Sequence, residues 1–201
     1  MKNNLFVKLV IFSVVKGQLL IFLEKNNLLF GQVQKDKSLD ELAKDIFKKK
    51  IGADIGKNYL EQLYTFSNSK DETINIEVAY FALITSYLTR KDNLESFASA
   101  FSIKKDSRDY EIVSYAVKRL QWKIEYTNVV YSLLSDDFTF SQLQKTYEAI
   151  LGKSLDKRNF RKKILSLNII KRTGRKKNLG KARPAEMFSF KKKSLTFVEI
   201  L

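Results

Sequence analysis

The chain has 201 residues, with 37 Lys and Arg against 22 Asp and Glu, and it contains neither histidine nor cysteine. The missing residue types exclude disulfides, Cys/His zinc sites and the Ser-His-Asp and Cys-His catalytic systems. Hydrophobic residues make up 44% of the chain and aromatic residues 12%, which favours packed cores over wholesale disorder. The formal net charge of +15 indicates a polyanionic partner or an anionic surface.

The excess positive charge is concentrated at the C-terminal end. Residues 1–150 carry 21 Lys and Arg against 19 Asp and Glu, whereas residues 151–201 carry 16 against 3. A nearly neutral N-terminal region followed by a basic C-terminal region is typical of a nucleic-acid-binding protein that has a second function. A disordered basic tail is the alternative, and the apolar residues that recur through this stretch weigh against it.

The apolar N-terminus, residues 1–23, has to be tested as a signal peptide or membrane span. Two lysines and a glutamine interrupt it, and no small-residue cleavage site follows. Its pattern instead predicts two strands, Leu5–Val15 and Gln18–Glu24, that turn at Lys16-Gly17. We therefore expect a cytoplasmic protein with no membrane contact.

The rest of the first part mixes strands with one helix. Ser38 followed by Glu41 forms a capping-box pattern before apolar residues at helical spacing, and Gly52 ends that segment. The flanking apolar runs predict strands. The expected strands cover residues 28–33, 59–66 and 74–85, with a turn over 67–71.

A long helix from Asp109 to about Tyr126 is predicted to join the two parts, because its apolar residues recur at helical spacing. A short helix over 128–134 and a turn at Asp136-Asp137 follow. The next helix is predicted over 140–151. Its signals are a capping box formed by Thr139 and Gln142, a hydrophobic staple of Phe138 and Leu143, and the terminator Gly152.

A basic helix comes next, capped by Asp156 and running to Leu167. Two strands, 169–173 and 185–190, are joined by a basic segment over 174–184. Two helices, a basic helix and a hairpin with a basic tip, in that order, predict a winged helix-turn-helix. The fold class is therefore α+β.

In such a fold the basic helix enters the major groove and the hairpin contacts the DNA backbone or minor groove. Arginine and asparagine suit guanine and adenine edges, while lysine mostly meets phosphate. A charged face turned to solvent is the alternative. The candidate DNA-binding residues are Lys157, Arg158, Asn159, Arg161, Lys162, Arg172, Thr173, Arg175, Lys176, Lys177 and Arg183.

Six runs of the sequence match a known family of proteins: Lys123–Asn128, Phe138–Gln144, Tyr147–Gly152, Leu155–Phe160, Tyr59–Phe66 and Arg183–Ala185. The first four resemble the C-terminal winged helix of Nudix-related transcriptional regulators of the NrtR type. The fifth resembles a strand of the Nudix-like domain of these regulators, and the sixth resembles the start of their last wing strand. The resemblance spans most of the chain and is denser in the C-terminal part.

The resemblance implies a Nudix-like mixed-sheet domain for effector binding and dimerisation over residues 1–108, a connecting helix over 109–127, and a DNA-binding winged helix over 128–201. It implies a homodimeric regulator, expected to be a repressor, that binds palindromic double-stranded DNA. Effectors of the family include ADP-ribose and related NAD-derived compounds, and a relative senses arabinose. The choice between nucleotide and sugar stays open, and no effector-binding residue is assigned.

The sequence departs from the family of hydrolases at the Nudix box, whose clustered glutamates hold Mg²⁺. With the box aligned on its two glycines, cationic or alkyl side chains stand at the expected glutamates. We therefore expect no enzyme activity, no catalytic residue, no metal site and no cofactor. The glycines are Gly31 and Gly52; Lys37, Ile46, Lys49 and Lys50 replace glutamates, and Asp45 replaces the arginine.

Two other functions remain as alternatives. One is a Nudix-type hydrolase that uses unconventional metal ligands such as Glu41 and Asp45. The simpler interpretation is that these carboxylates belong to an ordinary solvent-exposed helix face. The other is a structural or RNA-associated module that binds without sequence preference. Five aromatic residues on predicted strands line a pocket or, as we favour, pack in the core: Tyr59, Tyr64, Phe66, Tyr80 and Phe81.

Overall fold

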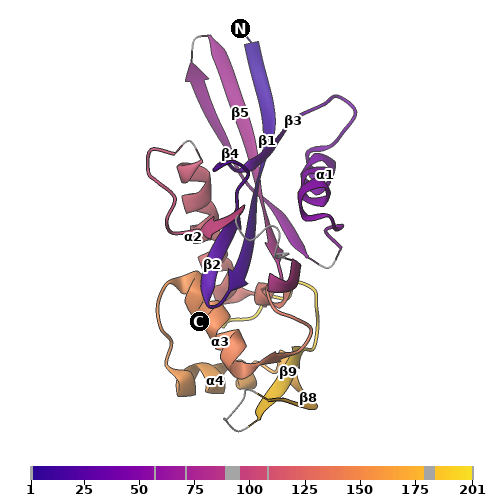
Figure 1. Cartoon of the computed structure of the whole chain (residues 1–201), viewed down its shortest axis with the longest axis vertical. Coiled ribbons are helices and arrows are strands. Elements are labelled where there is room, and N and C mark those ends of the chain that lie inside the picture. Colours follow the sequence, from indigo (N-terminus) through magenta and orange to yellow (C-terminus); the bar gives the residue numbers. More distant parts are fainter. Residues whose placement is uncertain are drawn as a thin grey trace.

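The computed structural model describes residues 2–56, 58–70, 72–88, 96–107, 109–178 and 184–200. A sheet flanked by helices forms one end of the molecule and a small helical and β part forms the other (Figure 1). The strands of the first part are β1 (Lys2–Val15), β2 (Gln18–Phe22), β3 (Leu29–Gln32), β4 (Tyr59–Lys70), β5 (Thr73–Ile84) and β6 (Phe97–Ser99). Its helices are α1 (Leu39–Ile51) and α2 (Tyr110–Tyr126), with a 3₁₀ turn over Ser86–Leu88.

The long strand β1 lies at the centre of a mixed sheet with the order β4-β5-β1-β2-β6. β1 pairs in parallel with β5 along one edge. Along its other edge, β1 pairs antiparallel first with β3 and then with β2. β1 and β2 are joined by Lys16 and Gly17, both with positive φ, which suits a tight hairpin turn.

Alternate residues of β1 and β5 face opposite sides of this sheet, and each side is covered by a helix. Val7, Leu9 and Ile11 pack with the buried face of α1. Val10 and Phe12 lie in the cluster that contains α2. Figure 1 shows α1 and α2 on opposite sides of the strands. The period-two alternation thus produces a helix–sheet–helix arrangement.

The second part contains the short 3₁₀ helix Val129–Ser132, α3 (Phe140–Leu151), α4 (Lys157–Ser166) and a three-stranded sheet. That sheet has the order β7-β9-β8, with β7 at Phe138–Thr139, β8 at Ile170–Lys177 and β9 at Ala185–Phe190. This is a winged helix-turn-helix, as predicted. The buried cluster around α2 continues into its core, so the two parts share apolar contacts.

The C-terminal segment after β9 returns to the end of α2. Val198 N donates to Tyr126 O at 2.9 Å, and Ile200 N donates to Glu125 O at 2.7 Å. Phe197 stacks on the Tyr126 ring with 6.2 Å between centroids. Ile200 is buried, with 1% of its surface exposed. The end of the chain therefore ties the connecting helix to the winged helix.

The four longer predicted helices, α1 to α4, are confirmed closely. Ser38 and Glu41 form the expected capping box, and Gly52 has the left-handed conformation that ends α1. Thr139 and Gln142 form the second box, and α3 covers the predicted residues. Asp156 caps α4 by accepting from Asn159 N at 2.8 Å.

Several details of the sequence prediction are wrong, among them the strand β6, which was not predicted. The predicted turn over 67–71 is strand as far as Lys70, because Asn68 pairs with Asn75 across β4 and β5 and Asn75 Nδ2 donates to Asn68 Oδ1. The predicted helix over 128–134 is a 3₁₀ helix only at Val129–Ser132. β8 extends four residues beyond the predicted strand, through an irregularity at Gly174. The first wing strand, β7, was not predicted, since two residues carry no period.

Candidate nucleic-acid interface

The basic face of α4 is exposed to solvent. Residues 157–177 contain ten Lys and Arg and no Asp or Glu. Phe160 and Ile164 turn inward and are buried, which leaves the predicted residues on the outer side of the helix. Tyr147 and Phe140 hold the Phe160 ring, with centroids 5.1 and 5.9 Å away. The exposed candidates on this helix are Lys157, Arg158, Asn159 and Lys162.

The turn before α4 is fixed by Glu148. Its Oε1 atom accepts from Leu155 N and from Gln144 Nε2, both at 3.0 Å. Because Leu155 precedes the cap residue Asp156, these bonds set where α4 begins relative to α3. The orientation of α4, the helix that carries most of the candidate DNA-binding residues, therefore depends on the Glu148 carboxylate of α3.

Arg161 differs from its neighbours on α4. Its guanidinium lies 4.7 Å from the centroid of the Phe140 ring and 5.9 Å from that of Phe188. Phe140 begins α3 and Phe188 lies in β9. Arg161 therefore joins α4 to both α3 and the wing through cation–π contacts. Sequence reasoning assigned it only to DNA, because helical spacing does not show which rings lie across the fold.

The wing carries the remaining described candidates. Arg172 Nε lies 3.1 Å from Glu186 Oε1, and Arg175 forms an ion pair with Asp137. The Thr173 hydroxyl donates to Met187 O at 3.2 Å, so this residue holds the two wing strands together. Lys176 and Lys177 are exposed at the end of β8. Arg183 lies outside the described residues.

The degenerate Nudix box lies where α1 packs on β3. A Cβ atom at Gly31 would lie 3.0 Å from Ile46 Cδ1, and Ile46 itself is 8% exposed. An apolar side chain thus fills the space beside the glycine. Lys37 forms an ion pair with Asp45, and Lys50 forms one with Glu24. The hydrogen bond from Lys50 lowers the pKa of Glu24.

The carboxylates near the box have other partners. Glu41 accepts from both the backbone N and the hydroxyl of Ser38, which lowers its pKa. Asp40 accepts from the Tyr80 hydroxyl at 2.5 Å. Burial, with this bond, raises the pKa of Tyr80, so the phenol stays a donor. Among the residues that the structure describes, no three His, Cys, Asp or Glu side chains gather as a metal site.

The five aromatic residues divide between two environments. Tyr59, Tyr80 and Phe81 are buried, as core packing predicts. Tyr64 is 53% exposed and packs with Phe66 against Tyr115 of α2. The preference for core packing is confirmed for Tyr59, Tyr80 and Phe81, and Phe66 is partly buried against the same core. For Tyr64 it is wrong.

Two ion clusters that sequence reasoning missed fasten α2 to the sheet. Asp109 precedes the helix and contacts Lys8 of β1, with 2.8 Å between Oδ1 and Nζ. Further along, Arg119 Nη2 donates to Glu61 Oε1 of β4 at 2.9 Å, and Lys123 also pairs with Glu61. The bond to Glu61 raises the pKa of Arg119. These contacts join residues 58 to 101 positions apart, so no sequence spacing indicates them.

No helix of the described residues is long and apolar enough to cross a membrane. The model of the NrtR DNA-binding winged helix domain matches residues 130–190. The solved structure of Shewanella oneidensis NrtR in complex with a 27mer DNA superposes with a TM-score of 0.78 and 24% identity, over 93% of both chains. A MutT/nudix family protein from Enterococcus faecalis superposes with a TM-score of 0.67 and 22% identity, over 95% of this chain and 87% of that one.

These superpositions show the fold that the resemblance implied, a Nudix-like part followed by a winged helix. The chain is also similar in sequence to a protein named as the ADPR-responsive transcriptional repressor NtrR of Acinetobacter baylyi. The two sequences are 30% identical over 204 residues, which cover 92% of this chain and 80% of the relative. The chain therefore belongs to the NrtR family of Nudix-related, DNA-binding transcriptional regulators.

Proposed function

We propose that this protein is a homodimeric, cytoplasmic repressor that binds a palindromic DNA site and releases or binds it according to the concentration of ADP-ribose or a similar compound. The observation that carries the proposal is the exposed, acid-free basic face of α4 on a winged helix. The effector class is proposed because the Acinetobacter baylyi relative is named as ADPR-responsive. Residues 1–108 would serve effector binding and dimerisation, 109–127 would connect, and 128–201 would bind DNA.

Within α4, Arg158 and Asn159 are proposed to read base edges, and Lys157 and Lys162 to contact phosphates. Arg161 would contact DNA while its guanidinium is held by the Phe140 ring. The wing residues Arg172, Thr173, Arg175, Lys176, Lys177 and Arg183 would contact the backbone. The acidic partners of Arg172 and Arg175 lower the local positive charge, which favours Lys176 and Lys177 as the stronger phosphate contacts.

The test is selection of bound duplexes from a random DNA pool by the full chain. A palindromic consensus supports the proposal, because two wings related by a dimer axis read inverted half-sites. On that consensus, Asn159→Ala is expected to cost about 1–3 kcal/mol and to relax one base position. Lys176→Ala is expected to weaken all sequences alike and to lower the salt slope by about 1.

Lys44→Ala, on α1, is the matched control, because it removes an exposed lysine far from α4. Salt-sensitive binding without enrichment of any sequence would instead support the module that binds nucleic acid without preference.

We further propose that the protein does not hydrolyse nucleoside diphosphate derivatives. Support comes from Ile46, which fills the space beside Gly31, and from Lys49 and Lys50 at expected metal-ligand positions. Adjacent ammonium groups repel Mg²⁺ rather than bind it. Turnover of ADP-ribose with Mg²⁺ or Mn²⁺ tests this. Hydrolysis that is abolished by Asp45→Asn or Glu41→Gln would overturn the proposal.

A further inference from the structure

One apolar side chain stands among the basic residues on the outer face of α4. Leu165 is 42% exposed, and among the described residues it is the only large apolar side chain of α4 or the wing strands that is so exposed. Positions i, i+4 and i+7 of a helix share one face, so Leu165 continues the stripe that Arg158 and Lys162 begin. Phe160 and Ile164 turn inward and are buried. Leu165 is therefore separate from the apolar core under α4.

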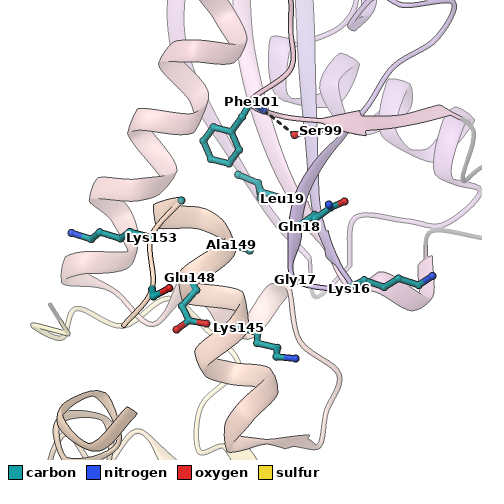
Figure 2. Close-up of a pocket in the computed structure, with 12 residues that line it drawn as sticks. Lys16, Gly17, Gln18, Leu19, Ser99, Phe101, Lys145, Glu148, Ala149 and Lys153 are labelled. Carbon is teal, nitrogen blue, oxygen red and sulfur yellow. Dashed lines mark hydrogen bonds between the residues drawn. The ribbon is translucent and has the colours of Figure 1, made fainter. Parts of the chain in front are cut away.

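Exposed aromatic side chains elsewhere in the described chain belong to other surfaces. Phe197 stacks on Tyr126 at the end of α2. Phe101 stands between the sheet part and the end of α3 (Figure 2), where a methyl group built on Gly152 would lie 3.9 Å from its Cζ atom. Leu165 is thus a single apolar group surrounded by cations. Such a setting suits a polyanion that presents a small apolar group better than an apolar protein surface, because the centres of protein interfaces are poor in charge.

The backbone that carries Leu165 is held in place by the end of α4. Asn168 N donates to Leu165 O at 3.2 Å, and the partly buried Leu167 packs against the core. Asn168 has a positive φ of 55°, and its side-chain oxygen accepts from the amine of Lys191, which follows β9. Because these contacts close the helix before DNA binds, a contact made by the Leu165 side chain costs little further ordering of the backbone.

The major groove of DNA presents one apolar group, the 5-methyl group of thymine. Contact between this methyl group and an aliphatic side chain removes apolar surface of both molecules from water. The contact distinguishes thymine from the other three bases, none of which carries a methyl group at that position. An exposed leucine on a helix that enters the major groove can therefore contribute to base recognition without a hydrogen bond.

We infer that Leu165 is a specificity-determining residue whose side chain contacts the methyl group of a thymine in each half-site. The inference rests on the proposed function, since it takes α4 as the helix that enters the major groove. Leu165 lies seven residues after Arg158, which is about 10 Å along the helix axis. The major groove is about 12 Å wide, so both residues can reach bases of one half-site.

The test combines a substitution in the full chain with a substitution in the operator. The operator is the consensus recovered from the random pool, and each thymine of a half-site is replaced in turn by deoxyuridine, which lacks only the methyl group and keeps the same base pairing. At one position, the wild-type chain is expected to bind the thymine operator about three- to ten-fold more tightly than the uracil operator. For Leu165→Ala, this ratio of affinities is expected to fall to about one, because the side chain that contacts the methyl group is gone.

Leu195→Ala is the matched control, because it truncates an exposed leucine outside α4 and is expected to keep the wild-type ratio. The inference fails if Leu165→Ala weakens the thymine and uracil operators alike, since Leu165 then acts only through the stability of α4. It also fails if no thymine gives a ratio above one with the wild-type chain. In both cases a palindromic consensus that Asn159→Ala relaxes would leave the proposed function standing. A pool that yields no consensus would overturn the proposed function and the inference together.

Discussion

Asp109, the residue before α2, accepts a hydrogen bond from the amine of Lys8 at the centre of the sheet, with 2.8 Å between Oδ1 and Nζ. The two residues are 4% and 7% exposed. Oδ2 of the same carboxylate accepts from Leu28 N at 2.6 Å. Lys8 also lies 3.7 Å from Glu77 and over the Phe30 ring. One carboxylate therefore fixes the start of the connecting helix to two segments of the sheet part.

Replacement of Asp109 by alanine is expected to lower the free energy of unfolding by about 3 kcal/mol, because it leaves the buried Lys8 amine and the Leu28 N–H without this acceptor. Urea denaturation measures the change. The control is Asp54→Ala, which removes a pair with Lys48 whose side chains are 75% and 63% exposed. That variant is expected to lose at most about 1 kcal/mol, since exposed pairs contribute little. Equal losses in both variants would contradict the role of Asp109.

Arg161 is expected to act on stability as well as on DNA. Because its guanidinium lies over the Phe140 ring, Arg161→Ala should lower the free energy of unfolding by about 0.5–1 kcal/mol or somewhat more. Arg158→Ala, on the exposed side of the same helix, should change stability little. Thermal unfolding without DNA compares the two. If Arg158→Ala destabilises the chain as much as Arg161→Ala does, the ring contact is not the reason.

The C-terminal segment is expected to contribute to the stability of the winged helix. Ile200 is 1% exposed and lines a cavity with Phe160 of α4. Ile200→Ala is therefore expected to cost about 2 kcal/mol or more, the lower end of the range for buried truncations because the chain end can relax. Leu195→Ala, at a residue that is 37% exposed, is the control. Denaturant midpoints that coincide for the two variants would refute this prediction.

The packing of Gly31 against α1 gives a test by double substitution. Gly31→Ala places a methyl group 3.0 Å from Ile46 Cδ1 and 3.2 Å from Leu42 Cδ1, so we expect a loss of about 1–3 kcal/mol from overpacking. Ile46→Val removes the Cδ1 atom and should make room for that methyl group. The double variant is then expected to be more stable than the sum of the two single effects. Additive effects would show that the two side chains do not meet.

Local patterns predicted the helices of this protein well. The two capping boxes at Ser38 and Thr139 involve residues three apart, and each terminating glycine donates to the carbonyl four residues before it, so all these partners are close in sequence. The order of elements after residue 136 and the basic face of α4 were likewise readable, because charge and period are local. The wing sheet was predicted without β7, whose two residues pair only through contact with Phe188 and Met187.

The candidate site was predictable in part. The loss of acidic residues from the box follows from the sequence, because a lysine cannot ligate Mg²⁺ as a carboxylate does. Only the structure shows that Ile46 lies beside Gly31 and that Asp45 forms an ion pair with Lys37. Similarly, the candidate DNA-binding residues could not be divided from the sequence into those with structural contacts, Arg161 and Thr173, and those that face solvent, such as Lys162 and Lys176.

The sequence by itself determined the secondary structure of the helices, the concentration of charge at the C-terminal end, and the absence of the hydrolase ligands. Each of these depends on residue type and short spacing. Only the tertiary structure decided how β1 pairs with β5, how Asp109 and Glu61 hold α2, and how Arg161 meets the rings of Phe140 and Phe188. Those contacts join residues far apart in the chain, and their geometry is set by packing of the shared core rather than by any local preference.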